Sequence, residues 1–172
     1  IWLVNDNPVE GGIYRTTNGG LNWTHQLNAG GSNPGNIYMV NNDTGFAGRQ
    51  ARLFRTTNSG INWTLMNGEE GFVDMHFINN STGWKSSGDF YKTTNGGSNW
   101  ELISLPPKGG NIVFSQIGEF QVINEDTIWG VGSVFITPAG LRGVIYITTD
   151  GGQTWGYQLP DTSIHSGTYR HI

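Results

Sequence analysis

Short runs of β-branched and aromatic residues alternate with polar turn residues along the whole chain. The segments 37–40, 73–78 and 120–123 are runs of this kind, and each is followed by a turn rich in Asn, Asp, Ser and Thr. Runs bounded in this way predict short strands joined by tight turns. No stretch keeps the period of about 3.6 residues that marks an amphipathic helix. The pattern therefore predicts an all-β protein.

The predicted strands recur in units of four. After the first strand and its polar turn, an aromatic residue opens a second strand, a third strand follows, and a fourth begins at a Trp. The aromatic residues are Phe46, Trp84 and Trp129, and the third strands are 52–55, 89–92 and 144–147. Units of this size must stack on neighbours to bury their apolar faces, as the blades of a propeller do. We therefore predict a β-propeller made of four-stranded antiparallel blades.

One motif lies between the third and fourth strands of every unit. Its form is Thr-Thr-Asn/Asp-Gly/Ser-Gly-x-Asn/Thr-Trp, and the four copies span 16–23, 56–63, 93–100 and 148–155. The Asn or Asp side chain can bind backbone amides two residues on, the Gly suits a positive φ, and the Trp offers a large apolar plate to the core. We assign a structural role in the turn to Thr16, Asn18, Gly20, Trp23, Thr56, Asn58, Gly60, Trp63, Thr93, Asn95, Gly97, Trp100, Thr148, Asp150, Gly152 and Trp155.

This motif resembles the Asp-box, or BNR repeat, of sialidases, some glycoside hydrolases, sortilin-type receptors and photosystem II assembly factors. The wider pattern, with Asn-x-x-Thr-Gly-Trp before the motif, is most similar to the Ycf48/HCF136-like assembly-factor propellers and related secreted bacterial proteins. The resemblance covers nearly the whole chain and implies a propeller in an extracytoplasmic location. Three copies carry Asn where the family has Asp, which only Asp150 keeps. Asn can make the same turn bonds without charge.

The repeats assign the chain to a single propeller domain or propeller fragment. The predicted blades span about 1–27, 36–66, 72–105 and 117–159, with a final strand at 165–172. The first residues align with a second strand and the last residues with a first strand. The last strand could therefore complete the first blade and close a ring of four, or the chain could be part of a larger propeller. We favour the larger propeller, because the families that it resembles usually have six or more blades.

Composition and charge exclude several classes of function. The net charge is −4, and the nine Lys and Arg residues are scattered, so no basic stripe marks a nucleic-acid partner. Cysteine is absent, which excludes disulfides and thiol catalysis. No run approaches the roughly 18 apolar residues that a membrane-spanning helix needs. We therefore predict no nucleic-acid partner and no direct membrane span.

The titratable residues favour no catalytic, cofactor or metal site. Sialidase chemistry needs a convergent arginine cluster, but Arg15 and Arg55 occupy one repeated position in their blades. The four His residues lack metal-ligand spacing. Hydrolysis of a glycoside needs two suitably spaced carboxylates. The carboxylates on the expected ligand face are Glu69, Glu70, Asp89 and Asp161. The adjacent pair 69–70 lies between glycines and is typical of a solvated loop tip.

The expected ligand face lies opposite the motif turns. It consists of the loops that join the second strand to the third and the fourth strand to the next blade, including Asn28–Asn36 and Pro106–Gly110. The long spacing in the last unit predicts an insertion at Phe135–Arg142, and an insertion that breaks a repeat often carries function. The predicted partner contacts are Arg49, Arg52, Lys108, Thr137, Pro138, Leu141 and Arg142.

These observations predict a non-catalytic propeller that binds a protein partner. An assembly factor, a scaffold or an extracellular interaction module would act in this way, and the resemblance implies a membrane-protein complex as one kind of partner. A second interpretation is a carbohydrate-active propeller, either a glycoside hydrolase fragment or a glycan-binding module. A third is a purely structural module of a larger secreted protein.

Overall fold

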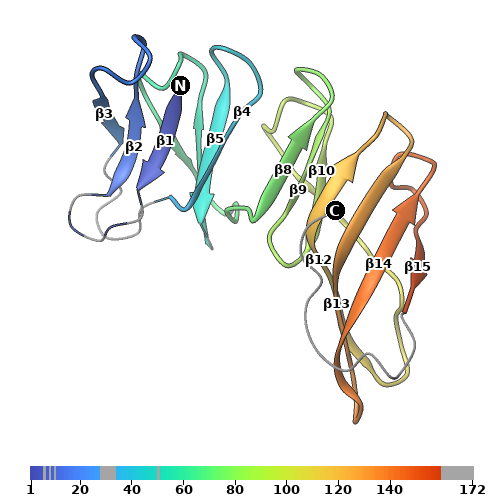
Figure 1. Cartoon of the computed structure of the whole chain (residues 1–172). Helices are drawn as coiled ribbons and strands as arrows, with labels where there is room; N and C mark the ends of the chain where they lie inside the picture. Colours follow the sequence, from blue (N-terminus) through green and yellow to red (C-terminus); the bar gives the residue numbers. More distant parts are fainter. Residues whose placement is uncertain (6, 8, 10, 28–33, 50, 160–172) are drawn as a thin grey trace. The chain divides into compact units, whose positions relative to one another are not determined.

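The structure, a computed structural model, consists of strands and turns (Figure 1). It describes residues 1–5, 7, 9, 11–27, 34–49 and 51–159. The predicted final strand at 165–172 and most of the loop Asn28–Asn36 lie outside these residues. The described residues contain no helix, which confirms the all-β prediction. The chain divides into two compact units, Ile1–Phe72 and Val73–Ile172, and each is described by itself.

The first unit contains two antiparallel sheets. One sheet has three strands and the other has four, and in both the strands follow one another in chain order. The strands are β1 (Trp2–Asn5), β2 (Gly12–Arg15) and β3 (Thr24–Leu27), then β4 (Asn36–Met39), β5 (Gly45–Arg49), β6 (Arg52–Thr56) and β7 (Thr64–Met66). Trp2 pairs with Arg15 just as Phe46 pairs with Arg55. β1 therefore takes the position of a second strand, as predicted.

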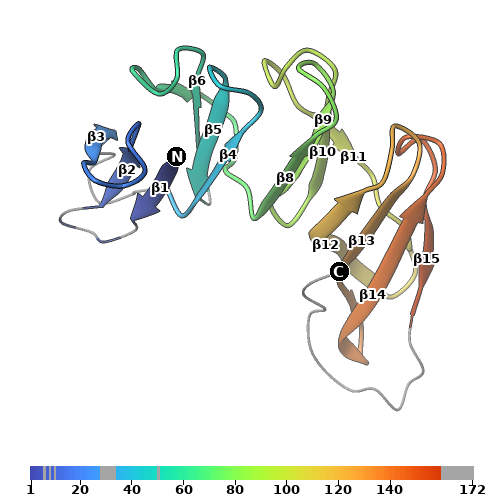
Figure 2. The same ribbon diagram turned by 45° about the horizontal axis from the view of Figure 1, so that its top comes forward.

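The second unit contains two four-stranded antiparallel sheets, again in chain order (Figure 2). The strands are β8 (Asp74–Phe77), β9 (Gly83–Ser86), β10 (Phe90–Thr93) and β11 (Glu101–Ile103), then β12 (Ile112–Val122), β13 (Ile128–Ile136), β14 (Gly140–Thr148) and β15 (Gly156–Gln158). One core joins these sheets, with Trp84 and Phe90 from the first of them and Ile117, Phe120 and Tyr146 from the second. The prediction of four-stranded antiparallel blades is confirmed.

The repeated motif forms the turn between the last two strands of each sheet. In the copy after β10, Thr93 Oγ1 donates to Asn95 Oδ1 at 3.0 Å and accepts from Gly97 N at 2.9 Å. Asn95 Oδ1 also accepts from Asn99 N at 3.0 Å. The Thr93 side chain is 2% exposed, so its hydroxyl group depends on these bonds in place of water. Gly97 has a φ of 72°, a conformation that favours glycine.

A second hydrogen bond ties each of three motif turns to another turn of its own sheet. Gly96 N donates to Ser81 O at 2.8 Å, in the turn between the first and second strands. The same bond joins Ser59 N to Asp43 O and Gly151 N to Asp126 O, both at 2.9 Å. One end of these sheets is therefore held by a repeated network of backbone and side-chain bonds.

The motif tryptophans lie just before the fourth strands and are less buried than the sequence suggested. Trp23 is 40% exposed, and the other three are partly buried. Trp155 packs edge-on against Phe90 at 5.3 Å and donates its Nε1 to Gly152 O at 3.2 Å. The tryptophans therefore cover the margin of the core. In the second unit the centre of the core is filled by Trp84, Tyr146 and Phe90, which are fully buried. In the first unit Phe46 is fully buried.

Three strands of the last sheet are longer than their counterparts. β12, β13 and β14 contain 11, 9 and 9 residues, whereas β8, β9 and β10 contain four each. The sequence prediction placed the extra residues in one insertion at Phe135–Arg142. The structure instead distributes them over three paired strands, with Phe114 opposite Phe135 and Phe135 opposite Leu141. We call residues 112–117, 132–136 and 140–144 the β-extension; Figure 1 shows the β13–β14 hairpin running past β15.

The buried hydroxyl group of the motif can be tested by Thr93→Val. Valine keeps the shape of the side chain but leaves Gly97 N without its buried acceptor. We expect the free energy of unfolding to fall by about 1–3 kcal/mol, measured by urea denaturation. Thr94→Val is the matched control, because Thr94 is the exposed neighbour in the same motif and should change stability by less than about 0.5 kcal/mol. Equal losses in both variants would contradict this role for the hydroxyl.

Candidate functional site

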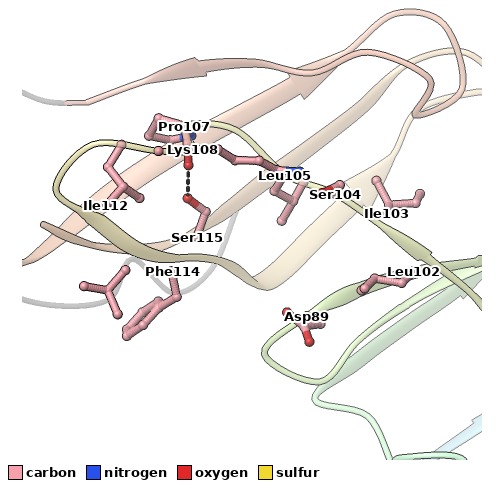
Figure 3. Close-up of a pocket in the computed structure, with 12 residues that line it drawn as sticks. Asp89, Leu102, Ile103, Ser104, Leu105, Pro107, Lys108, Ile112, Phe114 and Ser115 are labelled. Carbon is pink, nitrogen blue, oxygen red and sulfur yellow. Dashed lines mark hydrogen bonds between the residues drawn. The ribbon is translucent and has the colours of Figure 1, made fainter.

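A cavity of about 370 Å³ lies in the second unit beside the β-extension. Its walls come from the turn before β10, from β11 and the segment after it, and from the start of β12. They include Asp89, Leu102, Lys108, Val113, Phe114 and Ser115. Figure 3 shows Asp89 and Leu102 facing Phe114 across the space between these elements. The cavity therefore combines apolar walls with one cation and one carboxylate.

The segment between β11 and β12 is held firmly in place. Ser115 Oγ donates to Pro107 O at 2.8 Å, the bond drawn in Figure 3. Leu105 is 5% exposed and belongs to the core of the unit. Thr137 N, in the β13–β14 turn, donates to Asn111 O at 2.8 Å. The exposed side chain of Lys108 is therefore carried on a backbone that is anchored on both sides.

An apolar strip runs across one face of the β-extension. Residues directly opposite each other in antiparallel strands direct their side chains to the same face. Phe114, Phe135 and Leu141 are paired in this way, and the two Phe rings stack with centroids 5.8 Å apart. Phe114 is 37% exposed and Leu141 is 40% exposed. We call these three residues the apolar strip; exposed apolar side chains gathered in this way are typical of interaction sites.

The predicted partner contacts fall into two groups. Lys108 lines the cavity, Leu141 belongs to the apolar strip, and Thr137 and Pro138 are exposed in the turn at the end of the hairpin. Arg142 lies on the other face of β14, because successive residues of a strand alternate between faces. Arg49 is the last residue of β5 and Arg52 the first of β6, in the first unit, and the guanidinium carbon of Arg52 lies 5.0 Å from the ring centroid of Phe54. These two arginines therefore belong to a different unit from the other predicted contacts.

The described carboxylates considered for catalysis come from both units. Glu69 and Glu70 lie in the first unit, after β7, whereas Asp89 lines the cavity of the second unit. Asp161 lies outside the described residues. Within the described part of the chain, no group of three or more His, Asp or Glu side chains is placed to hold a metal ion. The described segments also contain no helix with the length and apolar character needed to cross a membrane.

Sequence reasoning missed a carboxylate that joins the two sheets of the second unit. Asp74 Oδ2 accepts from Phe120 N at 3.0 Å, and its Oδ1 accepts from Met75 N at 2.8 Å. Beside it, Ser86 Oγ donates to Gly118 O at 2.6 Å. Gly118 is the extra residue of the bulge in β12, and Phe120 lies two residues further on. Because β12 is the edge strand of its sheet, these two side chains bind backbone groups on its free edge. The bulge itself has no signal in the repeat pattern, which is why this role was not predicted.

Burial raises the pKa of Asp74 above its usual range, and the negative charge of Glu119 adds to the effect. The amides of Phe120 and Met75 and the nearby His76 act in the opposite direction but do not outweigh burial. Because both carboxylate oxygens are already bound by backbone amides, we interpret Asp74 as a structural bridge between sheets.

Comparison with known proteins identifies the motif and the fold. The sequence profile of the BNR/Asp-box repeat matches residues 146–155. The chain carries the Asp-box. This match contains Asp150, the copy that keeps the acidic residue of the family motif, while the other three Asp-boxes have Asn. No curated protein matches the chain.

Three solved structures illustrate the fold of the Asp-box chain. YCF48 bound to D1 peptide is 23% identical over 70% of this chain and 38% of that chain, with a TM-score of 0.52. The GH74 enzyme of Niastella koreensis is 21% identical over 86% of this chain and 26% of its own, with a TM-score of 0.62. The GH74 xyloglucanase from Xanthomonas campestris is 16% identical over 93% of this chain and 28% of its own, with a TM-score of 0.65.

At these identities the likeness shows the fold alone, which is that of a β-propeller. The chain spans less than two fifths of the length of each of the three structures. Its four sheets therefore correspond to part of a propeller, as the sequence predicted. The assignment of the whole chain to a single domain stays a prediction.

The Asp-box that matches the family profile carries a charge that the other copies lack. Thr154 donates its Oγ1 to Asp150 Oδ2 at 2.5 Å and its backbone N to Oδ1 at 2.9 Å, and Thr148 Oγ1 donates to Oδ1 at 2.8 Å. The bond from the Thr154 hydroxyl, with those from the Thr154 amide and Thr148, lowers the pKa of Asp150 to about 2. The turn therefore binds a carboxylate in its ionised form.

The pKa of Asp74 should lie above that of an ordinary Asp, which is about 3.9, and the pKa of Asp150 should lie below it. A raised folded-state pKa means that the contribution of Asp74 to stability is full below about pH 4 and is lost as the pH rises through its folded-state pKa. The contribution of Asp150 is present above about pH 4 and is lost as the pH falls through about 2. Carbon-13 NMR of the carboxyl groups measures both midpoints. A lower midpoint for Asp74 than for Asp150 would contradict both assignments.

Proposed function

We propose that this chain is a non-catalytic part of a propeller that binds a protein partner at its β-extension. The observation that carries the proposal is the apolar strip, in which two stacked Phe rings and a Leu are left partly exposed on paired strands. Exposed apolar and aromatic side chains surrounded by polar groups are the usual anchors of a protein interface. Lys108 and Asp89, in the cavity beside the strip, supply polar groups of both signs.

The support beneath the strip favours binding without a large ordering cost. Val134, Val144 and Ile117 are fully buried, so the inner face of the β-extension is packed into the core. The bond from Ser115 to Pro107 ties the same strands to the segment that carries Lys108. A surface that is already rigid loses little conformational freedom when a partner binds. The geometry therefore suits recognition of an extended or apolar segment of a protein.

One similar structure supports a peptide or protein as the partner. YCF48 has been solved bound to the D1 peptide and shares the fold of this chain. That likeness is one of fold, so the nature of the partner rests on the apolar strip. The further assignments to an assembly factor, a scaffold or an extracellular interaction module, to a membrane-protein complex as partner and to an extracytoplasmic location rest on the sequence resemblance and belong to the same proposal.

A second candidate function is recognition of a glycan. The two GH74 enzymes share the fold, and an exposed aromatic ring can pack against the apolar face of a sugar. Hydrolysis by paired carboxylates needs two groups roughly 5–9.5 Å apart. Asp89 is the single carboxylate among the described residues that line the cavity. A glycan-binding module without turnover is therefore the form that this second function would take.

The proposal predicts that peptides selected by phage display against the whole chain will depend on the apolar strip. Phe114→Ser should weaken their binding about 30-fold, since loss of a central aromatic anchor costs about 2 kcal/mol. Leu21→Ser is the matched control, because Leu21 is 83% exposed in the first unit and should leave binding unchanged. Affinities are measured by isothermal titration calorimetry, after circular dichroism has shown that both variants are folded.

Polysaccharides and aryl glycosides separate the two functions. Suppose that a polysaccharide binds the chain, that Phe114→Ser abolishes this binding, and that no selected peptide depends on the apolar strip. The partner would then be a glycan in place of a protein. Turnover of an aryl glycoside that is lost in Glu69→Gln, Glu70→Gln or Asp89→Asn would overturn the assignment as non-catalytic.

A further inference from the structure

A second cavity, of about 380 Å³, lies in the first unit on the side of the Asp-box turns. The β-extension belongs to the other unit. The walls of this cavity include Arg15, Asn18, Asn22, His25, Gln26 and Ile61. Among its described lining residues there is no Asp or Glu. The cavity therefore carries one permanent positive charge, that of Arg15, with no carboxylate to neutralise it.

Arg15 presents hydrogen-bond donors that the protein does not use fully. Its guanidinium carbon lies 5.1 Å from the ring centroid of Trp2, the residue opposite it in β1. Its Nε is buried and has no hydrogen-bond partner among the described residues. A guanidinium group is planar and matches the geometry of a carboxylate or sulfate group.

The equivalent cation of the third sheet is used differently. Lys92 also lies over the aromatic residue of its second strand, 5.3 Å from the ring centroid of Trp84. Its Nζ donates to Gly151 O, in the next Asp-box turn, at 2.7 Å. The ammonium group of Lys92 is therefore occupied by the backbone, whereas the guanidinium group of Arg15 opens onto a cavity.

The Asp-box bonds determine which part of Asn18 can meet a ligand. Asn18 Oδ1 accepts from Thr16 Oγ1 at 2.9 Å and from Asn22 N at 3.0 Å. With the oxygen held by the turn, the donor group Nδ2 is the part of the amide left to bind a ligand in the cavity. Gln26 Oε1 is buried without a partner and adds one acceptor, while Gln26 Nε2 donates to Ser59 O at 3.5 Å. The cavity thus offers donors for an oxyanion and an acceptor for a hydroxyl group.

Asn in place of Asp at position 18 keeps the described walls of this cavity free of carboxylates. Asp150 makes the same turn bonds in the fourth Asp-box, with 2.8 Å to Thr148 Oγ1 and 2.9 Å to the amide of Thr154. The turn therefore accepts either residue. An Asp at position 18 would place a carboxylate beside Arg15, in competition with any bound anion.

From these contacts we propose that the cavity binds the carboxylate or sulfate group of a small hydroxylated molecule, such as an acidic sugar. Arg15 and Asn18 donate to the oxyanion, and Gln26 Oε1 accepts from a hydroxyl group of the same ligand. This site does not rest on the protein partner proposed above, and binding at it should be unchanged in Phe114→Ser.

The test uses the whole chain labelled with nitrogen-15, titrated with sodium sulfate, sodium acetate or sodium glucuronate at constant ionic strength. The Nε–H resonance of Arg15 should shift and saturate with each oxyanion but not with chloride. Tighter binding of glucuronate than of acetate would assign the ligand to acidic sugars. Equal affinities would overturn the hydroxylated ligand and the role of Gln26, and would reduce the site to one for free anions.

Asn18→Asp should weaken binding of all three probes at least about tenfold, because it sets a like charge against the ligand. Its turn bonds have a precedent at Asp150, so it should remain folded. Asn95→Asp, the same change in the second unit, is the matched control and should leave binding unchanged. In Arg15→Gln, the backbone amide resonances of the residues around the cavity should no longer shift when a probe is added. Absence of a saturable shift in the wild type, or unchanged affinity in Asn18→Asp, would overturn the proposal.

Discussion

The buried threonine hydroxyl group of the Asp-box is the interaction on which the rest of the structure depends. Thr56 and Thr93 are 1% and 2% exposed, and each hydroxyl bridges an Asn side chain and a glycine amide of the same turn. A hydroxyl group cut off from water must find partners within the protein. The turn can satisfy it only when its backbone takes one shape, and that shape sets the register of the third and fourth strands. The bond from Gly96 N to Ser81 O then fixes the neighbouring turn as well.

The Asp-box turn fixes one end of each sheet in this way. The sheets differ in strand length at the other end. The fourth sheet lengthens three adjacent strands together, so that the added backbone groups pair with one another in place of remaining unsatisfied. β12 is the edge strand of this sheet and presents the amide of Phe120 and the carbonyl group of Gly118 to the preceding sheet. Asp74 and Ser86, from the preceding sheet, bind these groups. The apolar strip is thus supported both within its own sheet and from its neighbour.

The repeated positions of the blades carry different chemistry in different places. In three sheets a cation on the third strand lies over an aromatic ring on the second, with Arg15 over Trp2, Arg55 over Phe46 and Lys92 over Trp84. In the fourth sheet Ile147 stands opposite Trp129, which is 39% exposed. The ammonium group of Lys92 donates to a backbone carbonyl group, whereas Arg15 lines a cavity. A repeat can therefore keep its fold while single substitutions create or remove a binding site.

The sequence by itself determined the strands, the turns and the propeller fold, because those features depend on residues only a few positions apart. The Thr, Asn or Asp, and Gly of each Asp-box bond to one another within four residues, so their pattern is legible without the rest of the chain. Tertiary structure alone decided the length of β12, the partial exposure of the tryptophans, and the meeting of Asp74 with Phe120. It also placed Phe114 and Leu141 on one face. These depend on the register between distant strands, and a single bulge moves a side chain to the opposite face.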